Sequence, residues 1–242
     1  MPSQTIAAPF TLRCISSMAT QSILAQLVVA YAERTGQDVS MQSVGGVDAA
    51  KRVQAGEAFD VVLLASDAIK RLIALGRLVQ GGRVDWANCP VAIAVPCTAA
   101  APDIGDEAAL KQAVLAAPSI SYSTGPSGTH LAQLFERWGI ADAVKPKLVI
   151  PPSGTSVGSL IASGQVALGF QQLSELLNVC GVQVVGHLPV DVAFITTFSA
   201  AISVDLDAQH QQAAQDFVAF LNAPEADPVK QQHGMTPPKK IK

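Results

Sequence analysis

The sequence predicts an α/β fold with two lobes, each a mainly parallel sheet flanked by helices. Apolar runs of strand length alternate with amphipathic helical segments along the 242 residues, as in consecutive βαβ units. The strand predicted at 59–64 is almost entirely apolar, which is typical of a parallel strand covered on both faces. Because βα-rich sequence fills both halves of the chain, we expect two lobes with a cleft between them.

Three βα units make up the first part of the chain. Their apolar residues recur with strand or helix spacing, and Gly36, Gly56 and Gly76 end the three helices. The predicted pairs are strand 10–15 with helix 21–34, strand 39–44 with helix 49–55, and strand 59–64 with helix 66–75. Residues 78–85, which carry Gly81 and Gly82, predict a turn.

The remainder predicts a second βα-rich half that returns to the first. Its expected elements are strand 89–96, helix 107–116, a short strand into Ser121, helix 131–138, strand 148–150, helix 157–163, strands 166–170, 182–186 and 192–204, and helix 208–221. The long strands at 89–96 and 192–204 are natural crossovers between lobes. We therefore expect one lobe from 1–87 plus 197–242 and the other from 88–196.

Four strand-to-helix turns are rich in Ser, Thr and Gly, at 16–20, 45–48, 127–129 and 153–156. In open α/β sheets, ligands bind at the carboxyl ends of the strands, where these turns fall. Free N–H groups and helix dipoles at such turns attract anions, and neutral donors hold an anion without a buried countercharge. Simple N-capping, by Ser127 or Thr129 for example, is the alternative. We expect a cleft for a small anion.

Composition excludes several other classes of function. The net charge is −3 with no basic block before the last few residues, so we expect no nucleic-acid partner. The apolar runs are too short for a bilayer span, so we expect no membrane insertion. No leader is visible in the first ten residues, which predicts a periplasmic location only if a leader was removed, and a cytoplasmic one if Met1 is native.

Cysteine and histidine spacing gives no metal motif, so we expect no metal. We also expect no cofactor and a monomer. All four cysteines are interpreted as buried thiols, and His210 and His233 as solvent-facing. No Walker loop, G-x-S-x-G or H-E-x-x-H is present. The acids and bases near the turns are Asp48, Asp67, His130 and Glu175, each also explained by its early-helix position. If the protein is an enzyme, His130 or Glu175 is the expected proton-transfer group. The cations nearest the expected cleft are Arg13, Lys51, Arg52 and Arg83.

Through the order and spacing of several motifs, the chain resembles the molybdate-type substrate-binding proteins of ABC importers over nearly all of residues 10–222. The motifs are Ser16-Ser17 after the first strand, Gly56-x-x-x-Asp60-Val61, Pro126-Ser127-Gly128 before a helix, and 164–170, which reads Gly-Gln-Val-Ala-Leu-Gly-Phe. The resemblance implies a two-lobed type II periplasmic-binding fold, an ABC permease partner if the protein is exported, and an oxyanion held by hydroxyls and backbone amides. The ligand-binding residues implied are Ser16, Ser17, Met18, Gly45, Gly46, Ser127, Gly128, Thr129, Gly154, Thr155, Gln171 and Gln172.

Two departures from the family pattern bear on the ligand. The second turn reads Val44-Gly45-Gly46-Val47 where the family has Gly-Ser-Gly, and Gln171 or Gln172 stands where it has a ligand tyrosine. The segment 169–177 is similar to a branch that also resembles bacterial aconitate isomerase. The resemblance implies an organic polycarboxylate ligand first, an isomerase that moves a proton along a tricarboxylate as the alternative, and molybdate or tungstate as the lesser one.

Overall fold

A computed structural model describes residues 10–152 and 154–238 of the chain. Ser153, which belongs to the fourth predicted turn, and the two chain ends lie outside the described residues. Within the described part, eight strands form one sheet in the order β2-β1-β3-β8-β4-β6-β5, and β7 also pairs with β4. The strands are β1 Thr11–Ser17, β2 Asp38–Val44, β3 Val61–Ala65, β4 Val84–Pro96, β5 Ile120–Tyr122, β6 Leu168–Gln172, β7 Val182–His187 and β8 Ile195–Ile202.

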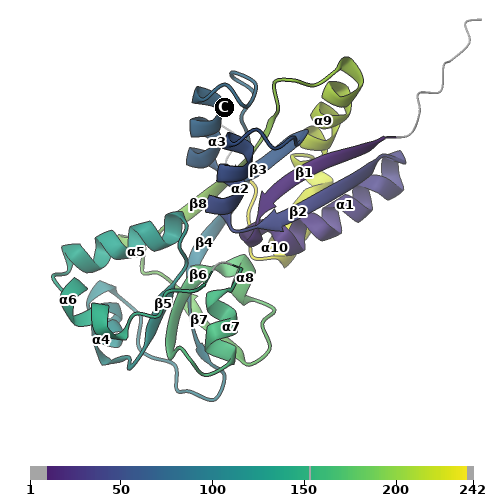
Figure 1. Cartoon of the computed structure of the whole chain (residues 1–242). Coiled ribbons are helices and arrows are strands. Elements are labelled where there is room, and N and C mark those ends of the chain that lie inside the picture. The colour runs from purple at the N-terminus through teal and green to yellow at the C-terminus, as the bar shows by residue number, and fades with distance from the viewer. Residues whose placement is uncertain (1–9, 153, 239–242) are drawn as a thin grey trace, which may run out of the picture.

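Helices flank this sheet, and strands and helices together form two lobes (Figure 1). They are η1 Met18–Thr20, α1 Gln21–Thr35, α2 Gly46–Gln54, α3 Ser66–Ala74, α4 Glu107–Ala116, α5 Pro126–Arg137, α6 Ala141–Val144, α7 Val157–Ala162, α8 Leu173–Leu176, α9 Ala208–Leu221 and α10 Asp227–Gln232. The first lobe holds β1–β3 with α1–α3, α9 and α10, and the second holds β5–β7 with α4–α8. Strands β4 and β8 connect the lobes.

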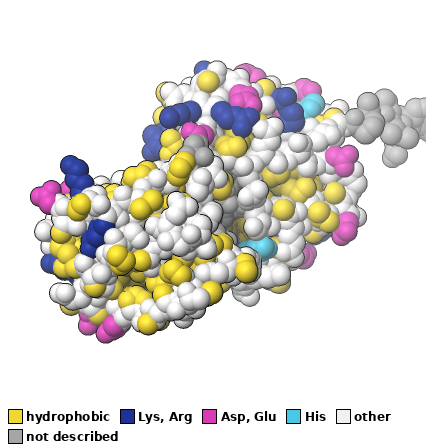
Figure 2. All heavy atoms as spheres, turned by 60° about the horizontal axis from the view of Figure 1, so that its bottom comes forward, with side chains coloured by type: hydrophobic (Ala, Val, Ile, Leu, Met, Phe, Trp, Pro, Cys, Tyr) yellow, Lys and Arg dark blue, Asp and Glu magenta, His cyan; other side chains and the backbone are white. Residues whose placement is uncertain are grey.

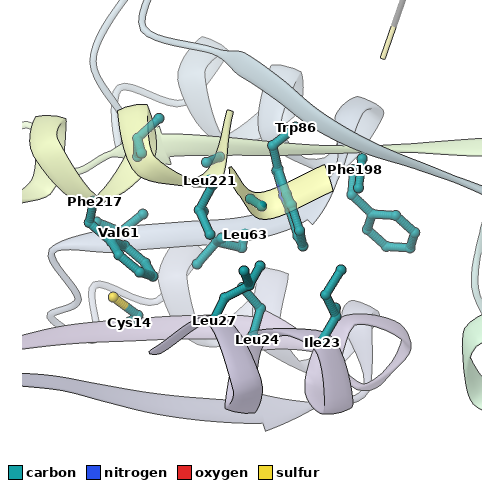
Figure 3. Close-up of a cluster of buried hydrophobic side chains, with 14 of the residues drawn as sticks. Cys14, Ile23, Leu24, Leu27, Val61, Leu63, Trp86, Phe198, Phe217 and Leu221 are labelled. Atoms are coloured by element: carbon teal, nitrogen blue, oxygen red, sulfur yellow. The ribbon is translucent and has the colours of Figure 1, made fainter. Parts of the chain in front are cut away.

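The first-lobe sheet is covered on both faces, as its apolar strands predict. Val61 and Leu63 of β3 pack into one core cluster, whereas Val62 and Leu64 pack into another on the opposite face. Trp86 is fully buried in the larger cluster, between the strands and helices α1 and α9 (Figure 3). Burial of apolar surface contributes about 25 cal/mol per Å², so these two clusters stabilise the first lobe.

The second lobe is less parallel than expected. Strands β1–β2 and β1–β3 are parallel pairs, but in the second lobe only β5–β6 is parallel, while β4–β6 and β4–β7 are antiparallel. The reason is β4, which enters from the first lobe in the opposite direction and supplies the centre of the second sheet. Its residues 86–89 pack in the first-lobe core, and 91–95 pack in the second-lobe clusters.

Element boundaries differ from the predictions mainly at the turns. Helix α5 begins at Pro126 rather than 131, because proline is well suited to the first helical position. Helix α2 begins at Gly46 rather than 49. Strand β8 is shorter than the predicted 192–204, since 190–192 form a 3-10 turn, and β4 begins at 84 within the predicted turn. The glycine-bracketed turns are thus the first turns of helices.

Candidate functional site

A cleft of about 560 Å³ lies where the two lobes meet. All four predicted turns contribute to its lining, together with strand β6, helix α8 and strand β8. In Figure 2 the lobes meet along a furrow, and several Lys and Arg side chains lie on the first lobe near it. The lining that the sequence predicts comprises Ser17, Met18, Gly45, Gly46, Ser127, Gly154, Thr155, Gln171, Gln172, Lys51, Asp48 and Glu175.

On the first lobe, the turn after β1 places a hydroxyl without a partner in the cleft wall. Ser17 is 7% exposed, and its buried Oγ has no hydrogen-bond partner among the described residues. A Cβ added to Gly46 would lie 3.5 Å from the Cβ of Ser17, so the first two turns are in contact. An unpaired buried hydroxyl is costly, and a ligand oxygen at this position would satisfy it.

Two cations of the first lobe also line the cleft. Lys51 lies on α2 and Arg71 on α3, and both side chains are exposed. Among the described residues, neither side chain has a hydrogen-bond or ion-pair partner. By contrast, the neighbouring Lys70 pairs with Asp67 at 3.0 Å. The charge of Arg71 also helps to lower the pKa of Asp67, but neither Arg71 nor Lys51 is hydrogen-bonded or ion-paired among the described residues, so both cations are available to the cleft.

On the second lobe, the start of α5 is held by close packing. Ser127 is 2% exposed, and its Oγ is 2.7 Å from the Oγ of Ser123. A Cβ on Gly128 would lie 1.6 Å from the carbonyl oxygen of Ser123, so only glycine fits this position. Pro126 has no N–H and the Thr129 N–H donates to the Gly125 carbonyl oxygen, so the Ser127 and Gly128 amides are the α5 donors without an acceptor within the helix, and Ser127 lines the cleft.

The glutamine pair of β6 is buried, and each amide has a different environment. Gln172 donates from Nε2 to Thr196 Oγ1 of β8 at 2.5 Å, and its buried Oε1 has no partner among the described residues. Gln171 accepts from the Gly158 N–H at 3.0 Å and donates to Glu175 Oε1 at 2.8 Å. Gln171 is therefore already bonded on both sides, whereas Gln172 retains an unsatisfied polar atom in the cleft wall.

Glu175 is the acid whose ionisation the site changes most. Burial raises the pKa of Glu175 to about 7, although the hydrogen bond from Gln171 opposes the shift. A carboxyl group with a pKa near neutrality in a cleft is suited to accept and return a proton. Asp48 also lines the cleft, in the first turn of α2.

His130 lies away from this cleft. Its Nε2 donates to the carbonyl oxygen of Val192 at 3.1 Å, and its ring stacks on Phe194 with 4.6 Å between centroids. Three predicted ligand residues also lie outside the lining. Ser16 is fully buried with its Oγ 2.8 Å from Ser43 Oγ, Gly128 packs under Ser123, and Thr129 is an exposed residue of α5.

The cleft includes residues that sequence reasoning missed. They include Gln54, Arg71 and Thr196. Arg71 follows Ser66 by five residues, and only the placement of α3 turns its side chain toward the cleft. Thr196 belongs to a crossover strand, and no local pattern distinguishes it from a structural residue.

Two predictions about cysteine and histidine were wrong. Cys14 and Cys89 are buried, but Cys97 and Cys180 are exposed, Cys97 just after the end of β4 and Cys180 just before the start of β7. His233 is buried, with Nε2 3.0 Å from Gln26 Oε1, and burial lowers its pKa. The C-terminal segment that carries His233 packs against the first lobe. The spacing of residues in the sequence did not indicate this burial.

A two-lobed α/β fold with an interlobe cleft lined by donors is the architecture of solute-binding proteins. The chain belongs to the family of bacterial extracellular solute-binding proteins, whose sequence pattern matches residues 12–236. The predicted fold class is confirmed, and so is the family resemblance that the motifs indicated.

Three similar proteins illustrate the range of this family and fold. The chain is 32% identical to aconitate isomerase from Pseudomonas sp over 94% of the chain and 88% of that protein. It is 22% identical to the putative ABC transporter substrate-binding lipoprotein YvgL of Bacillus subtilis (strain 168), over 93% and 86%. The periplasmic molybdate-binding protein of Azotobacter vinelandii has the same fold, with a TM-score of 0.78 at 20% identity, over 94% of this chain and all 100% of that one.

Two features are absent from the described residues. No helix between residues 10 and 238, Ser153 aside, has the length and apolarity to cross a bilayer. In the same part of the chain, no cluster of three or more His, Cys, Asp or Glu side chains could hold a metal ion.

Proposed function

We propose that the cleft binds a small organic anion with at least two carboxylates. The observation that carries this proposal is the pair of unpaired cations, Lys51 and Arg71, on adjacent helices of the first lobe. Each can pair with one carboxylate, and hydrogen bonds between charged partners are the strong kind. A single tetrahedral oxyanion held by neutral donors needs neither cation. An organic polycarboxylate is therefore favoured over molybdate or tungstate.

Neutral groups supply the remaining contacts in this proposal. The unpaired Ser17 hydroxyl and the starts of α2 and α5 donate to ligand oxygens. The unpaired atom of Gln172 is the acceptor Oε1, so Gln172 donates to a carboxylate only through the Nε2 hydrogen that does not bond Thr196. We propose that the contributing residues are Ser17, Met18, Gly45, Gly46, Lys51, Arg71, Ser127, Gly154, Thr155 and Gln172.

We further propose that the protein acts as a monomer whose two lobes, 1–87 plus 197–242 and 88–196, close on the ligand. Its membership in a solute-binding family supports an ABC permease as the partner, if the protein is exported.

Calorimetric titration tests the ligand class. We expect binding of citrate, cis-aconitate or trans-aconitate, with weaker or no binding of molybdate, tungstate and sulfate. Affinity should fall as salt increases, because the ligand pairs with exposed cations. Binding of molybdate alone, or of none of these anions, would overturn the proposal.

A second function, isomerisation of a tricarboxylate such as aconitate, is favoured by Glu175. This acid lines the cleft, its pKa of about 7 suits proton transfer, and the 32% identical relative is an aconitate isomerase. Of the two proton-transfer candidates from the sequence, His130 lies outside the cleft lining and Glu175 within it.

The chemistry is a 1,3-proton transfer. The Glu175 carboxylate removes a proton from the methylene carbon of trans-aconitate, and the C–H electron pair becomes part of an allylic carbanion. The double bond shifts by one position as Glu175 returns the proton to the former vinyl carbon. Positive charge from Lys51 and Arg71 on the neighbouring carboxylates stabilises the anionic intermediate. No oxidant, reductant or metal takes part in the balance.

Proton NMR in heavy water tests this second function. We expect trans-aconitate and cis-aconitate to interconvert with the wild-type protein, and Glu175→Gln to bind both isomers without converting them. If wild type binds aconitate but neither converts it nor exchanges its methylene protons for deuterium, the isomerase proposal fails and the binding proposal stands.

A further inference from the structure

We infer that Gln171 is a positioning residue that fixes the orientation of Glu175, so that one chosen oxygen of this carboxyl group faces the cleft. The inference rests on the proposed role of Glu175 for its functional meaning. The family resemblance places Gln171 among ligand-binding residues, but its contacts point to a different task.

The orientation of the Gln171 amide is set by a backbone donor. The Gly158 N–H, near the start of α7, donates to Gln171 Oε1 at 3.0 Å. A backbone N–H can only donate, so it identifies that atom as the oxygen and leaves Nε2 on the other side. Gln171 is 2% exposed, so its amide has little freedom to turn.

The fixed amide then distinguishes the two oxygens of Glu175. Gln171 Nε2 donates to Glu175 Oε1 at 2.8 Å, so Oε1 must accept in both protonation states. Oε2 has no hydrogen-bond partner among the described residues and is not among their fully buried unpaired atoms. Proton uptake therefore occurs on Oε2, the oxygen open to the cleft.

Other charged groups around Glu175 come from elements across the cleft or beneath it. Asp48 and Lys51 of α2 and Arg71 of α3 line the same cleft from the first lobe, and Cys89 of β4 lies under α8 near the Glu175 charge. Among the described residues, only Gln171 is hydrogen-bonded to the carboxyl group. Replacing Gln171 therefore removes the one donor to Glu175, and it also leaves the Gly158 N–H without its acceptor.

The test is a carbon-13 NMR titration of the Glu175 carboxyl group, assigned by its loss in Glu175→Gln. In Gln171→Met, which keeps the chain length and removes the amide, we expect the Glu175 midpoint to rise by about one pH unit, because a donor to the charged form is lost. Gln183→Leu, an exposed change on β7, is the matched control and should leave the midpoint unchanged. An unchanged or lower midpoint in Gln171→Met would overturn the inference.

Wild-type protein provides a second measurement if Gln171→Met does not fold. The side-chain nitrogen-15 resonance of Gln171 should shift with the same midpoint as the Glu175 carboxyl, and an independent midpoint or no shift would also overturn the inference. If isomerase activity is found, the acid limb of its kcat profile should move with the NMR midpoint. If it is not found, the isomerase proposal fails while both titrations still decide the role of Gln171.

Discussion

Ser174 Oγ donates a 2.7 Å hydrogen bond to the carbonyl oxygen of Ala19, joining α8 of the second lobe to η1 of the first. The bond lies one residue from Glu175 in the sequence and two residues from Ser17. It therefore ties the two lobes together beside the segments that carry Glu175 and Ser17. Cys89 of the connecting strand β4 donates to the same Ser174 oxygen at 3.5 Å.

Replacing Ser174 by alanine should remove this link between lobes. We expect Ser174→Ala to lower the free energy of unfolding by about 1 kcal/mol, since the carbonyl of the half-buried Ala19 loses its donor. Urea unfolding measures the change. Ser163→Ala, which removes a local 3.1 Å bond to Leu160 within one lobe, is the control and should cost less. If both substitutions lower the free energy of unfolding equally, the interlobe bond stabilises the protein no more than a local bond does.

The two adjacent cations of α3 give a matched pair of variants. Arg71→Ala should weaken citrate or aconitate binding about tenfold, which corresponds to about 1.4 kcal/mol, and should reduce the salt dependence. Lys70→Ala should lower affinity much less than Arg71→Ala, because Lys70 lies outside the cleft lining and acts on Arg71 only through their shared neighbour Asp67. Calorimetry at two salt concentrations measures both effects. Similar losses for the two variants would contradict a specific role for Arg71.

Glu175 should make stability depend on pH. Its folded-state pKa of about 7 lies above the ordinary value of 4.5, so the native state binds more protons than the unfolded state between these values. The stabilising effect of the protonated carboxyl is complete below about pH 4.5 and is lost as pH rises to 7.

Urea unfolding of wild type and Glu175→Gln at pH 5 and pH 8 measures this dependence. Relative to wild type, Glu175→Gln should gain on the order of 1–3 kcal/mol between the two pH values, because glutamine does not ionise. A constant difference between the two proteins would mean that Glu175 titrates normally.

Gly128 and Gly125 test the packing at the start of α5. Gly128→Ala places a methyl group 1.6 Å from the Ser123 carbonyl oxygen, and the forced shift should cost about 1–3 kcal/mol and weaken ligand binding. Gly125→Ala meets no atom within 4 Å and has a negative φ, so it should cost less than about 1 kcal/mol. Thermal unfolding compares them. If both variants are equally stable, the tight turn does not constrain the site.

The sequence predicted the fold well where apolar periodicity alone decides structure. The βα units of the first lobe and helices 107–116 and 208–221 follow from the spacing of their buried residues. The pairing of the second lobe did not follow, because the direction in which β4 enters depends on the whole chain. Helix starts were placed late at Gly46 and Pro126, since glycine and proline also favour turns.

For the site, local chemistry identified the turns but not the charges between them. Ser17, Gly45, Gly46, Ser127 and Gln172 line the cleft because each directly follows a strand, begins a helix or ends a strand. Arg71 lies within a helix, and its approach to the cleft depends on packing of α3 against β3 and β8. Burial of Glu175, which moves its pKa, also depends on packing that no local pattern encodes.

A crystal structure with trans-aconitate or citrate tests the central claim most directly. The account predicts a ligand in the interlobe cleft, with carboxylates within hydrogen-bond distance of Arg71 and Lys51 and a further oxygen on Ser17. A carboxylate bound outside the cleft, or a cleft that accepts only a tetrahedral oxyanion on neutral donors, would contradict it.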